Sequence, residues 1–507
     1  MDFRTTWLST ACTSLRFLSR RATQHGLIRA AWVACGGLVA GCGSGGPSGG
    51  SPASPNSGAP AGTQVTVVLA SDANDRFTEF HAVFQGITLT SSAGKSVTLL
   101  SQSLGTEFVH LNGLAAPIIT GTLPQDTYTA ATVTVGYSDF ACLALNTDGG
   151  LEDSIFAYGY VPAPDVSVNL PGPIEVTGDS MGLTLRILVQ QSAILSSCSD
   201  QASYAIRPTF TLTSFDIANA AAGSASNTVS SLVGAVTAVS APSGSFEVQR
   251  PAFKSQSTTS LKVSIDSGTA LQGVDDLASL AVGLFVEFDG AIQADGSVHA
   301  TRVAVADPAA VDVRRGPIIS VFNQATPIVI IQPTEGLGKD GVVNTETYDF
   351  SSTSFRISGQ LSNVQHLPFT ATFSADNMVP GQNVYLSSPA FDTCCGQDYY
   401  APATTMTLMP QTINGTVLGS SSSGKFTIYA VELADYDPFV TLAVQPAQTT
   451  LLTQPDQVQV YVDSSTRRTS NSEPVAPGST VRFYGLVFND QGVLRMDCAQ
   501  INDGVSQ

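Results

Sequence analysis

Short runs of alternating apolar and polar residues dominate the chain beyond residue 62. Gln64–Leu69 (QVTVVL), Leu183–Gln190 (LTLRILVQ) and Thr209–Phe215 (TFTLTSF) are examples. A period of two puts every second side chain on the same face of a β-strand, whereas an amphipathic helix needs a period near 3.6. Val, Ile, Phe and Tyr in such runs, with abundant Ser, Thr and Gly, are typical of secreted all-β proteins. The sequence therefore predicts an all-β, multi-domain fold.

The first 41 residues have the composition of an export signal. Arginines at 16, 20, 21 and 29 precede or border the apolar run 30–40 (AAWVACGGLVA). That run is too short to span a bilayer, which takes about 20 residues, but it suits the apolar part of a signal peptide. The run leads into LVAGC, which ends at Cys42 and resembles the lipobox of bacterial lipoproteins. The resemblance implies cleavage before Cys42 and a diacylglycerol and palmitate anchor on its sulfur.

A flexible tether is predicted directly after Cys42. Residues 43–62 consist only of Gly, Ser, Pro, Ala and Asn. Such a stretch cannot bury apolar surface, and its root-mean-square reach is about 25 Å. We therefore expect a cell-envelope protein held at the membrane by lipid. Gly43 stands where an Asp would favour the inner membrane, so by analogy the outer membrane is the expected location.

The charge of the chain argues against a nucleic-acid partner. Residues 1–41 contain five arginines and one acidic residue, so the remainder has 17 basic and 39 acidic residues and a formal charge of −22. Such a field repels polyanions, and no basic stripe interrupts it.

The first folded unit is predicted at 63–217. Phe80–Thr90 (FHAVFQGITLT) and Ser96–Leu100 read as a hairpin, and Leu123–Tyr128 (LPQDTY) leads into the strand Thr129–Val135. This order of elements resembles domain-of-unknown-function family 4382, found near the N-terminus of bacterial lipoproteins. The resemblance implies a β-sandwich in which the tyrosine anchors a strand, and it implies no activity.

An internal repeat occupies the second half of the chain. Gly283–Gly290 (GLFVEFDG) and Gly478–Gly485 (GSTVRFYG) carry Gly, Val, Phe and Gly at the same offsets, and residues 316–411 form a degenerate copy between them. Val and Phe two residues apart share a buried face, and the glycine marks a bend of a small barrel. The units resemble domain-of-unknown-function family 5666, which implies small β-barrels in tandem.

The predicted boundaries are a signal peptide at 1–41, the tether at 42–62, the β-sandwich at 63–217, and β-barrel repeats at 231–308, 314–411 (degenerate) and 413–503.

Five cysteines come after Cys42. Cys142 and Cys198 fall in one predicted domain, and an oxidising compartment would let them pair. Cys498 is a candidate partner for Cys394 or Cys395. A metal site is not favoured, because no CxxC and no nearby histidine accompanies these cysteines.

Two acidic loops are candidate calcium ligands, since calcium binds six to eight oxygen atoms. One contains Asp72, Asn74 and Asp75, and the other contains Asp148, Glu152 and Asp153. Neither has the spacing of an EF-hand, and Asp, Asn and Gly also make ordinary turns. Apart from the lipid and this calcium, no cofactor is expected.

One motif would fit a hydrolase. Gly178–Gly182 (GDSMG) matches the GxSxG pattern that presents a nucleophilic serine, here Ser180. The alternating strand after it places this motif at a hairpin turn instead of a strand-to-helix elbow. The histidines further along the chain, His299 and His366, fall in other predicted domains. No catalytic residue is therefore assigned.

These observations favour a non-enzymatic cell-envelope lipoprotein that serves as a surface binding, adhesion or structural module. Its expected partners are the membrane, through the lipid, and an envelope, glycan or protein ligand. Two alternatives stay open: a calcium-assisted glycan- or peptidoglycan-binding protein, and a secreted serine hydrolase that uses Ser180.

Overall fold

The computed structural model describes most of the chain between Gly62 and Asn502. Outside the described residues lie 1–61, 72–78, 102, 109–110, 112–114, 142–158, 194–203, 218–226, 251–259, 308–311, 324, 338–344, 359–363, 390–399, 435–436, 444–451, 469–474 and 503–507. Residues 59–507 form one compact unit, which contains every described residue.

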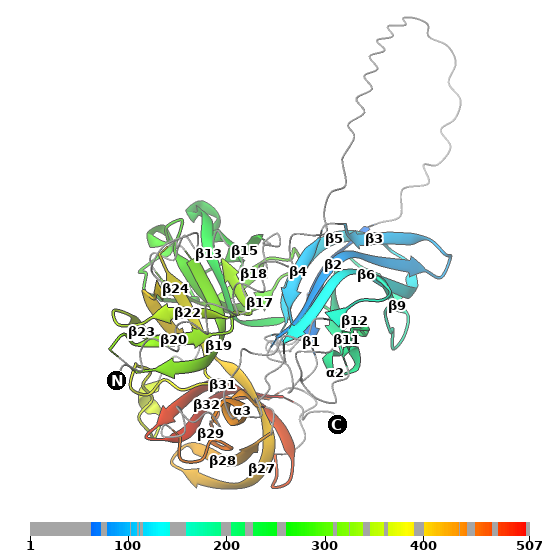
Figure 1. Ribbon diagram of the computed structural model, residues 1–507. Coiled ribbons are helices and arrows are strands. Elements are labelled where there is room, and N and C mark those ends of the chain that lie inside the picture. Colours follow the sequence, from blue (N-terminus) through cyan, green and yellow to red (C-terminus); the bar gives the residue numbers. More distant parts are fainter. Residues whose placement is uncertain are drawn as a thin grey trace, which may run out of the picture. The chain divides into compact units, whose positions relative to one another are not determined.

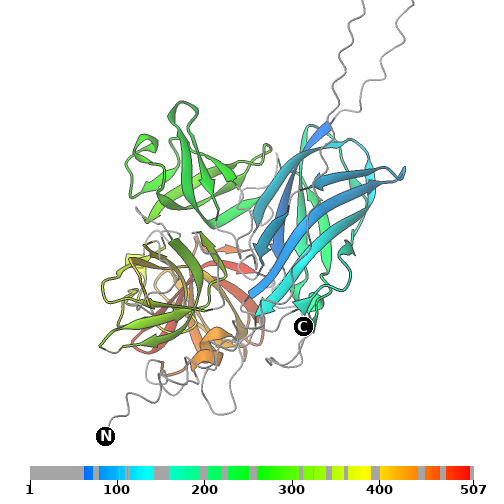
Figure 2. The ribbon, with the colours of Figure 1, turned by 45° about the horizontal axis from the view of Figure 1, so that its top comes forward.

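A β-sandwich forms the first part of this unit. Its strands are β1 (Gly62–Ser71), β2 (Glu79–Ser91), β3 (Ser96–Leu100), β4 (Leu104–Glu107), β5 (Ala116–Pro124), β6 (Thr127–Ala141), β7 (Gly159–Tyr160), β8 (Asp165–Ser167), β9 (Ile174–Glu175), β10 (Ser180–Ile187), β11 (Tyr204–Ala205) and β12 (Phe210–Phe215), with the short helix α2 (Val189–Ser192) after β10. One sheet has the order β12-β10-β1-β5, and the other has the order β3-β2-β6-β8 with β4 and β9 at its margins. Side chains of both sheets share one apolar core, and the strands are the blue to teal arrows of Figure 2.

Several strands of the sandwich were predicted from alternation and are confirmed. β10 and β12 pair antiparallel, and β2 pairs with β3 as a hairpin. Tyr128 is buried at the start of β6, and its hydroxyl donates a hydrogen bond to the Pro124 carbonyl oxygen at 3.1 Å. This bond closes the turn of the LPQDTY segment, so the tyrosine anchors the strand entry as expected.

The first barrel comes after the sandwich (green in Figure 1). Its strands are β13 (Thr228–Ser240), β14 (Ser245–Gln249), β15 (Ser260–Ser264), β16 (Ala270–Gln272), β17 (Phe285–Ile292) and β18 (Val298–Asp307). The sheet runs β15-β14-β13-β17-β18-β16, and a parallel pairing of β15 with β18 closes it into a barrel of five strands.

The last barrel repeats this pattern strand for strand (orange to red in Figure 1). Its elements are β27 (Gln411–Ser423), β28 (Phe426–Leu433), α3 (Pro438–Ala443), β29 (Gln457–Val462), β30 (Arg467–Arg468), β31 (Thr480–Asp490) and β32 (Val493–Asn502). The order is β29-β28-β27-β31-β32-β30, and β29 pairs parallel with β32 to close the barrel.

The middle barrel is built from β19 (Asp312–Phe322), β20 (Ile328–Ile331), β21 (Glu335–Leu337), β22 (Glu346–Asp349), β23 (Ser354–Ile357), β24 (Asn383–Ser388), β25 (Ala401–Pro402) and β26 (Thr405–Leu408). β19 pairs with β20 on one side and with β24 on the other, as the first strand does in the other two barrels. The parallel closing pair is β22 with β25, which leads directly into β26.

One glycine turn occurs in all three barrels and explains the repeated motif. Gly283, Gly381 and Gly478 have φ of +92°, +92° and +87°, a conformation that side chains with a Cβ rarely adopt. Each of these glycines donates its N–H to a carbonyl oxygen of the first strand of its barrel, from Val236, Ile318 and Val417 respectively. The middle barrel therefore keeps this glycine turn, although its sequence matches the repeated motif only in part.

The all-β, multi-domain class is confirmed. Within the described residues the α-helices are limited to the four residues of α2 and the six of α3. None of the helices in the described part of the chain is long and apolar enough to cross a membrane.

Candidate functional site

Most of the residues singled out from the sequence lie outside the described residues. These are Cys42, the cysteines Cys142 and Cys198, and the loop residues Asp72, Asn74, Asp75, Asp148, Glu152 and Asp153. Lipidation, the disulfide and the calcium loops therefore stay predictions. In the described part of the chain, no group of three or more His, Cys, Asp and Glu side chains is arranged to hold a metal ion.

Ser180 is the first residue of β10 and does not sit at a hairpin turn, contrary to expectation. β9 belongs to one sheet of the sandwich and β10 to the other, so the GDSMG segment crosses between the sheets. The carbonyl oxygen of Gly178 accepts hydrogen bonds from Thr63 Oγ1 at 2.6 Å and from Gln125 Nε2 at 2.9 Å. The motif is thus a backbone crossover, and β10 continues it as a strand where a nucleophile elbow needs a helix.

His299 lies beside a different serine. Its Nδ1 is 3.3 Å from Ser264 Oγ, and its Nε2 is 3.3 Å from Asp266 Oδ2. The three side chains gather where β15 and β18 pair in parallel, and the imidazole and the carboxylate are 37% and 59% exposed. Water competes with a contact between side chains this exposed, so the contact contributes about 1 kcal/mol or less. His366, in contrast, is an exposed residue of a 3₁₀ turn, Val364–His366.

Cys498 is a free cysteine, and its candidate partners Cys394 and Cys395 lie outside the described residues. The thiol is buried in the last barrel and donates to the Gln500 carbonyl oxygen at 3.3 Å. Burial raises the pKa of this thiol well above its usual range, which keeps it in the unreactive thiol form.

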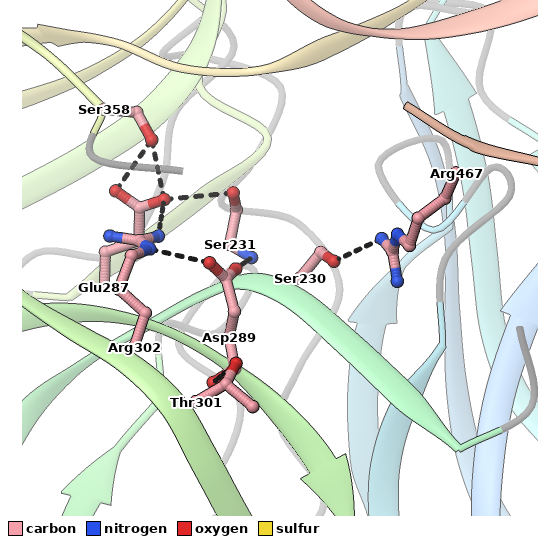
Figure 3. A network of polar contacts seen from close by, with 8 residues as sticks. All are labelled: Ser230, Ser231, Glu287, Asp289, Thr301, Arg302, Ser358 and Arg467. Carbon is pink, nitrogen blue, oxygen red and sulfur yellow. Dashed lines mark hydrogen bonds and ion pairs between the residues drawn. The ribbon is translucent and has the colours of Figure 1, made fainter. Parts of the chain in front are cut away.

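The most developed polar site is a buried charged network on the outer face of the first barrel (Figure 3). Arg302 of β18 lies between two acids of β17: its Nη2 is 3.0 Å from Glu287 Oε1, and its Nε is 2.7 Å from Asp289 Oδ2. The Arg302 and Glu287 side chains are only 8% and 2% exposed. Burial lowers the pKa of Arg302, but the two carboxylates outweigh burial and hold the pKa above its usual value.

Glu287 is also bound from the middle barrel. The Ser358 hydroxyl lies 2.6 Å and 2.8 Å from the two carboxylate oxygens, and Ser231 Oγ of β13 lies 3.0 Å from Oε1. The Ser231 backbone N–H donates to Asp289 Oδ1 at 2.7 Å, and Ser231 has φ of +50°. The strained backbone conformation of Ser231 thus directs its N–H toward the Asp289 carboxylate.

The last barrel reaches the same network. Arg467 Nη2 of β30 donates to Ser230 Oγ at 2.8 Å, as Figure 3 shows. Tyr484 of β31 is fully buried, and burial raises the pKa of its hydroxyl, partly offset by the charge of Arg315. We call the region where the three barrels share these contacts the junction.

Apolar packing supports the junction. The rings of Phe285 and Tyr385 stack with centroids 4.6 Å apart and planes 8° apart. Val233 and Phe285 of the first barrel share a buried cluster with Val313 and Tyr385 of the middle barrel. The junction is therefore a packed interface with polar contacts inside it.

A second buried ion pair stands close by in the middle barrel. Arg314 of β19 binds Glu346 at 2.9 Å and also pairs with Asp312. The Tyr348 hydroxyl binds Glu346, and burial followed by this carboxylate raises the pKa of Tyr348 above its usual range. All of these groups belong to the middle barrel.

Sequence reasoning missed the junction, although a signal was available. Only 12% of the residues are charged, yet Glu287 and Asp289 alternate on the outer face of a barrel strand. Arg302 stands opposite Asp289 on the paired strand. Charged residues on the outer face of adjacent strands indicate either solvent or a polar interface, and the sequence alone does not choose between these.

Comparison with protein families supports one part of this architecture. Residues 233–304, which form most of the first barrel, match the model described as Domain of unknown function (DUF5666). None of the curated proteins matches this chain.

Proposed function

We propose that this chain is a non-enzymatic cell-envelope lipoprotein, anchored through Cys42, whose folded part serves as a surface binding, adhesion or structural module. Its N-terminal sandwich resembles domain-of-unknown-function family 4382 and its barrels resemble family 5666, matched in the first barrel. The observation that carries the proposal is the junction, where Glu287 and Ser230 of the first barrel bind Ser358 and Arg467 of the other two.

The energetics of the junction favour a scaffold. A buried ion pair adds little stability compared with apolar packing of the same volume, because desolvation offsets the Coulomb attraction. Removing one partner is costly, so such a network selects one arrangement over others. A chain that fixes three small barrels against one another presents their outer surfaces as one unit, which suits contact with a large or repeated ligand.

The anchor is tested by metabolic labelling with a palmitate analogue in a bacterial host. The wild-type chain is expected to be labelled and to fractionate with membranes, and Cys42→Ala is expected to lose the label. Cys35→Ala is the matched control, because it removes a nearby signal-segment cysteine and leaves the lipobox residues in place. Label that persists in Cys42→Ala would contradict the anchor.

The binding role is tested separately with purified full-length Cys42→Ala protein. It is expected to sediment with envelope fractions or intact cells in a saturable manner. Failure to bind any fraction would remove the binding and adhesion versions of the proposal and leave only a structural role.

A further inference from the structure

The sandwich and the first barrel share one apolar core. Val68, Ala115 and Ile217 of the sandwich belong to the same buried cluster as the interior side chains of the first barrel. The turn at Gly296 of the first barrel lies so close to Thr120 of β5 that a Cβ on this glycine would clash with the threonine hydroxyl. Separating these two domains would expose apolar surface on both sides, which is unfavourable in water. We call them together the N-terminal half (62–307).

The middle and last barrels are joined in the same way. Val379 of the middle barrel belongs to the buried cluster of the last barrel, and Leu486 and Phe488 of β31 belong to that of the middle barrel. In addition, Gln382 Nε2 donates a hydrogen bond to the Val487 carbonyl oxygen at 3.0 Å. Neither barrel can leave the other without opening its own core. We call this pair the C-terminal half (312–502).

The contacts between the two halves are of a different kind, because hydrogen bonds form a large part of them. These bonds run from Ser358 to Glu287, from Arg467 to Ser230, and from Arg356 Nη1 to the Ala306 carbonyl oxygen, the last at 3.0 Å. When the halves separate, each of these bonds can be exchanged for a bond to water, so each contributes little net free energy to the closed arrangement.

The ion pairs of the junction do not hold the halves together. Arg302, Glu287 and Asp289 all belong to the first barrel, and Arg314 pairs with acids of its own middle barrel. Separation of the halves therefore breaks none of these pairs and returns water to their charges, which recovers hydration that burial removes. The high cost of leaving a buried charge without its partner does not arise.

An apolar cluster packs the two halves against each other. Its members are Val233, Phe285 and Ala306 of the N-terminal half and Val313, Tyr385 and Met409 of the C-terminal half. It is smaller than the clusters that run through each half. Hydrophobic burial in this cluster favours the closed arrangement, but domains of one chain move relative to one another unless their interface is large and apolar.

We propose that the folded part of this chain opens and closes as two rigid halves, along the seam where the first barrel meets the middle and last barrels. The polar network selects one closed arrangement, and opening leaves its ion pairs intact. The open arrangement is the minor one, since opening exposes the apolar cluster to water. It uncovers the Phe285 and Tyr385 rings, which stack in the closed form. This hinge goes beyond the binding role proposed above, and it does not depend on the anchor.

The test is thiol labelling of four matched variants under native conditions, each made in the full-length Cys42→Ala chain. Val233→Cys and Val313→Cys place a thiol on either side of the seam, whereas Val68→Cys and Val379→Cys place one inside the N-terminal and the C-terminal half. All four valines are at most 4% exposed, so a maleimide reaches each thiol only when the structure opens. Mass spectrometry of peptides separates the added thiols from the native cysteines, and circular dichroism checks the fold.

The two seam thiols are expected to react at similar rates, and at least about tenfold faster than the other two, because opening the seam needs less free energy than exposing a shared core. Equal rates at all four positions would mean that the chain opens only by global unfolding, which overturns the proposal. Faster labelling of Val68→Cys or Val379→Cys also overturns it, since separation would then occur inside a half. Fast labelling on one side of the seam alone indicates a local opening and has the same consequence.

A second set of variants weakens the seam itself. Arg467→Gln and Arg356→Gln each remove a charged donor that crosses it, at half-buried positions. Each is expected to raise the labelling rate of Val313→Cys about tenfold, the effect of one charge-assisted hydrogen bond, and to leave that of Val379→Cys within about twofold. Lys262→Gln is the matched control, because it removes one positive charge from an exposed strand position of the first barrel, and it should change neither rate. An unchanged rate for Val313→Cys in both arginine variants overturns the proposal. None of these outcomes bears on palmitate labelling of the anchor.

Discussion

The first and last barrels share the same strand order but carry different side chains on their outer faces. Their strands pair in the same order, and both close through a parallel pair. On the outer face, however, the first barrel carries Glu287 and Asp289 where the last barrel carries Arg482 and Tyr484. The interior positions depend on the geometry of a small barrel, which admits few side chains. The exterior positions depend on the neighbours that each barrel contacts.

The repeated glycines Gly290 and Gly485 lie at positions where the geometry of the barrel leaves no room for a side chain. A Cβ on Gly290 would lie 2.3 Å from the His299 carbonyl oxygen, and a Cβ on Gly485 would lie 2.0 Å from that of Asp497. Both glycines sit at a register shift between the last two long strands. The repeated glycine therefore reflects backbone contact, which the barrel requires whatever surrounds it.

The largest effect is expected for Glu287→Gln. This change leaves the buried Arg302 side chain with one acid in place of two, and it removes the ionised acceptor of the Ser358 bond. Breaking a buried pair costs about 4 kcal/mol, and the urea midpoint measures it. Lys425→Gln in the last barrel is the comparison: its pair with Asp463 is exposed on the lysine side, so the expected loss is about 1 kcal/mol or less. Equal losses would refute the distinction between buried and surface pairs.

The shared interior is probed by Gly485→Ala, which should destabilise the last barrel by about 3 kcal/mol, because the methyl group meets backbone that cannot rotate away. Gly290→Ala should do the same in the first barrel. Gly419→Ala is the control, since nothing lies within 4 Å of its added Cβ. Its expected effect is below about 1 kcal/mol and in the stabilising direction. Tolerance of alanine at both 290 and 485 would mean that the repeat does not depend on close backbone contact.

A smaller difference between the first and last barrels concerns how the stability of the protein depends on pH. Where the first barrel places His299 beside Asp266, the last barrel places Asp497 near Asp463. Burial, followed by the charge of Asp463, raises the pKa of Asp497 to about 6. Because this value lies above that of an unfolded Asp, about 3.9, the protonated form favours folding, and stability falls as the pH rises from about 4 through 6.

Asp497→Asn removes this dependence. The variant should exceed the wild type by about 2 kcal/mol at pH 8 and match it at pH 4, by urea unfolding at each pH. Asp179→Asn, at an exposed site, is the matched variant that removes one carboxylate elsewhere in the chain. A parallel profile for Asp497→Asn and the wild type would show that this carboxyl does not take up a proton on folding.

Local periodicity in the sequence predicted much of the fold. Alternation predicted the paired strands β10 and β12, and the spaced glycines predicted the first and last barrels and the strand pattern of the middle one. A further local pattern is the turn at Asp266, with the sequence DSGT, in which Gly268 N–H binds the carboxylate and Thr269 Oγ1 binds the Ala300 carbonyl oxygen. Its counterpart in the last barrel is DSST at Asp463.

The junction could not be predicted in this way. Glu287 and Ser358 are 71 residues apart, and which outer faces meet depends on how whole barrels dock. Hydrophobic alternation reports which side of a strand is buried within its own barrel. It does not indicate whether the polar, outward-facing side of the same strand is buried against another barrel. The same limit applies to Ser180, whose neighbours depend on a crossover between sheets.

The Ser230–Arg467 bond has a consequence for the order of folding. It joins residues 237 positions apart, whereas the strands of the first barrel close within their own segment. Contacts so distant form late, since the intervening chain must be made and folded first. The chain is synthesised from its N-terminus onward, so the first barrel can fold before the last barrel has been made. Ser230 is then still exposed to water. Docking of the last barrel then completes the junction, and a chain that ends before residue 467 lacks the Arg467 donor to Ser230.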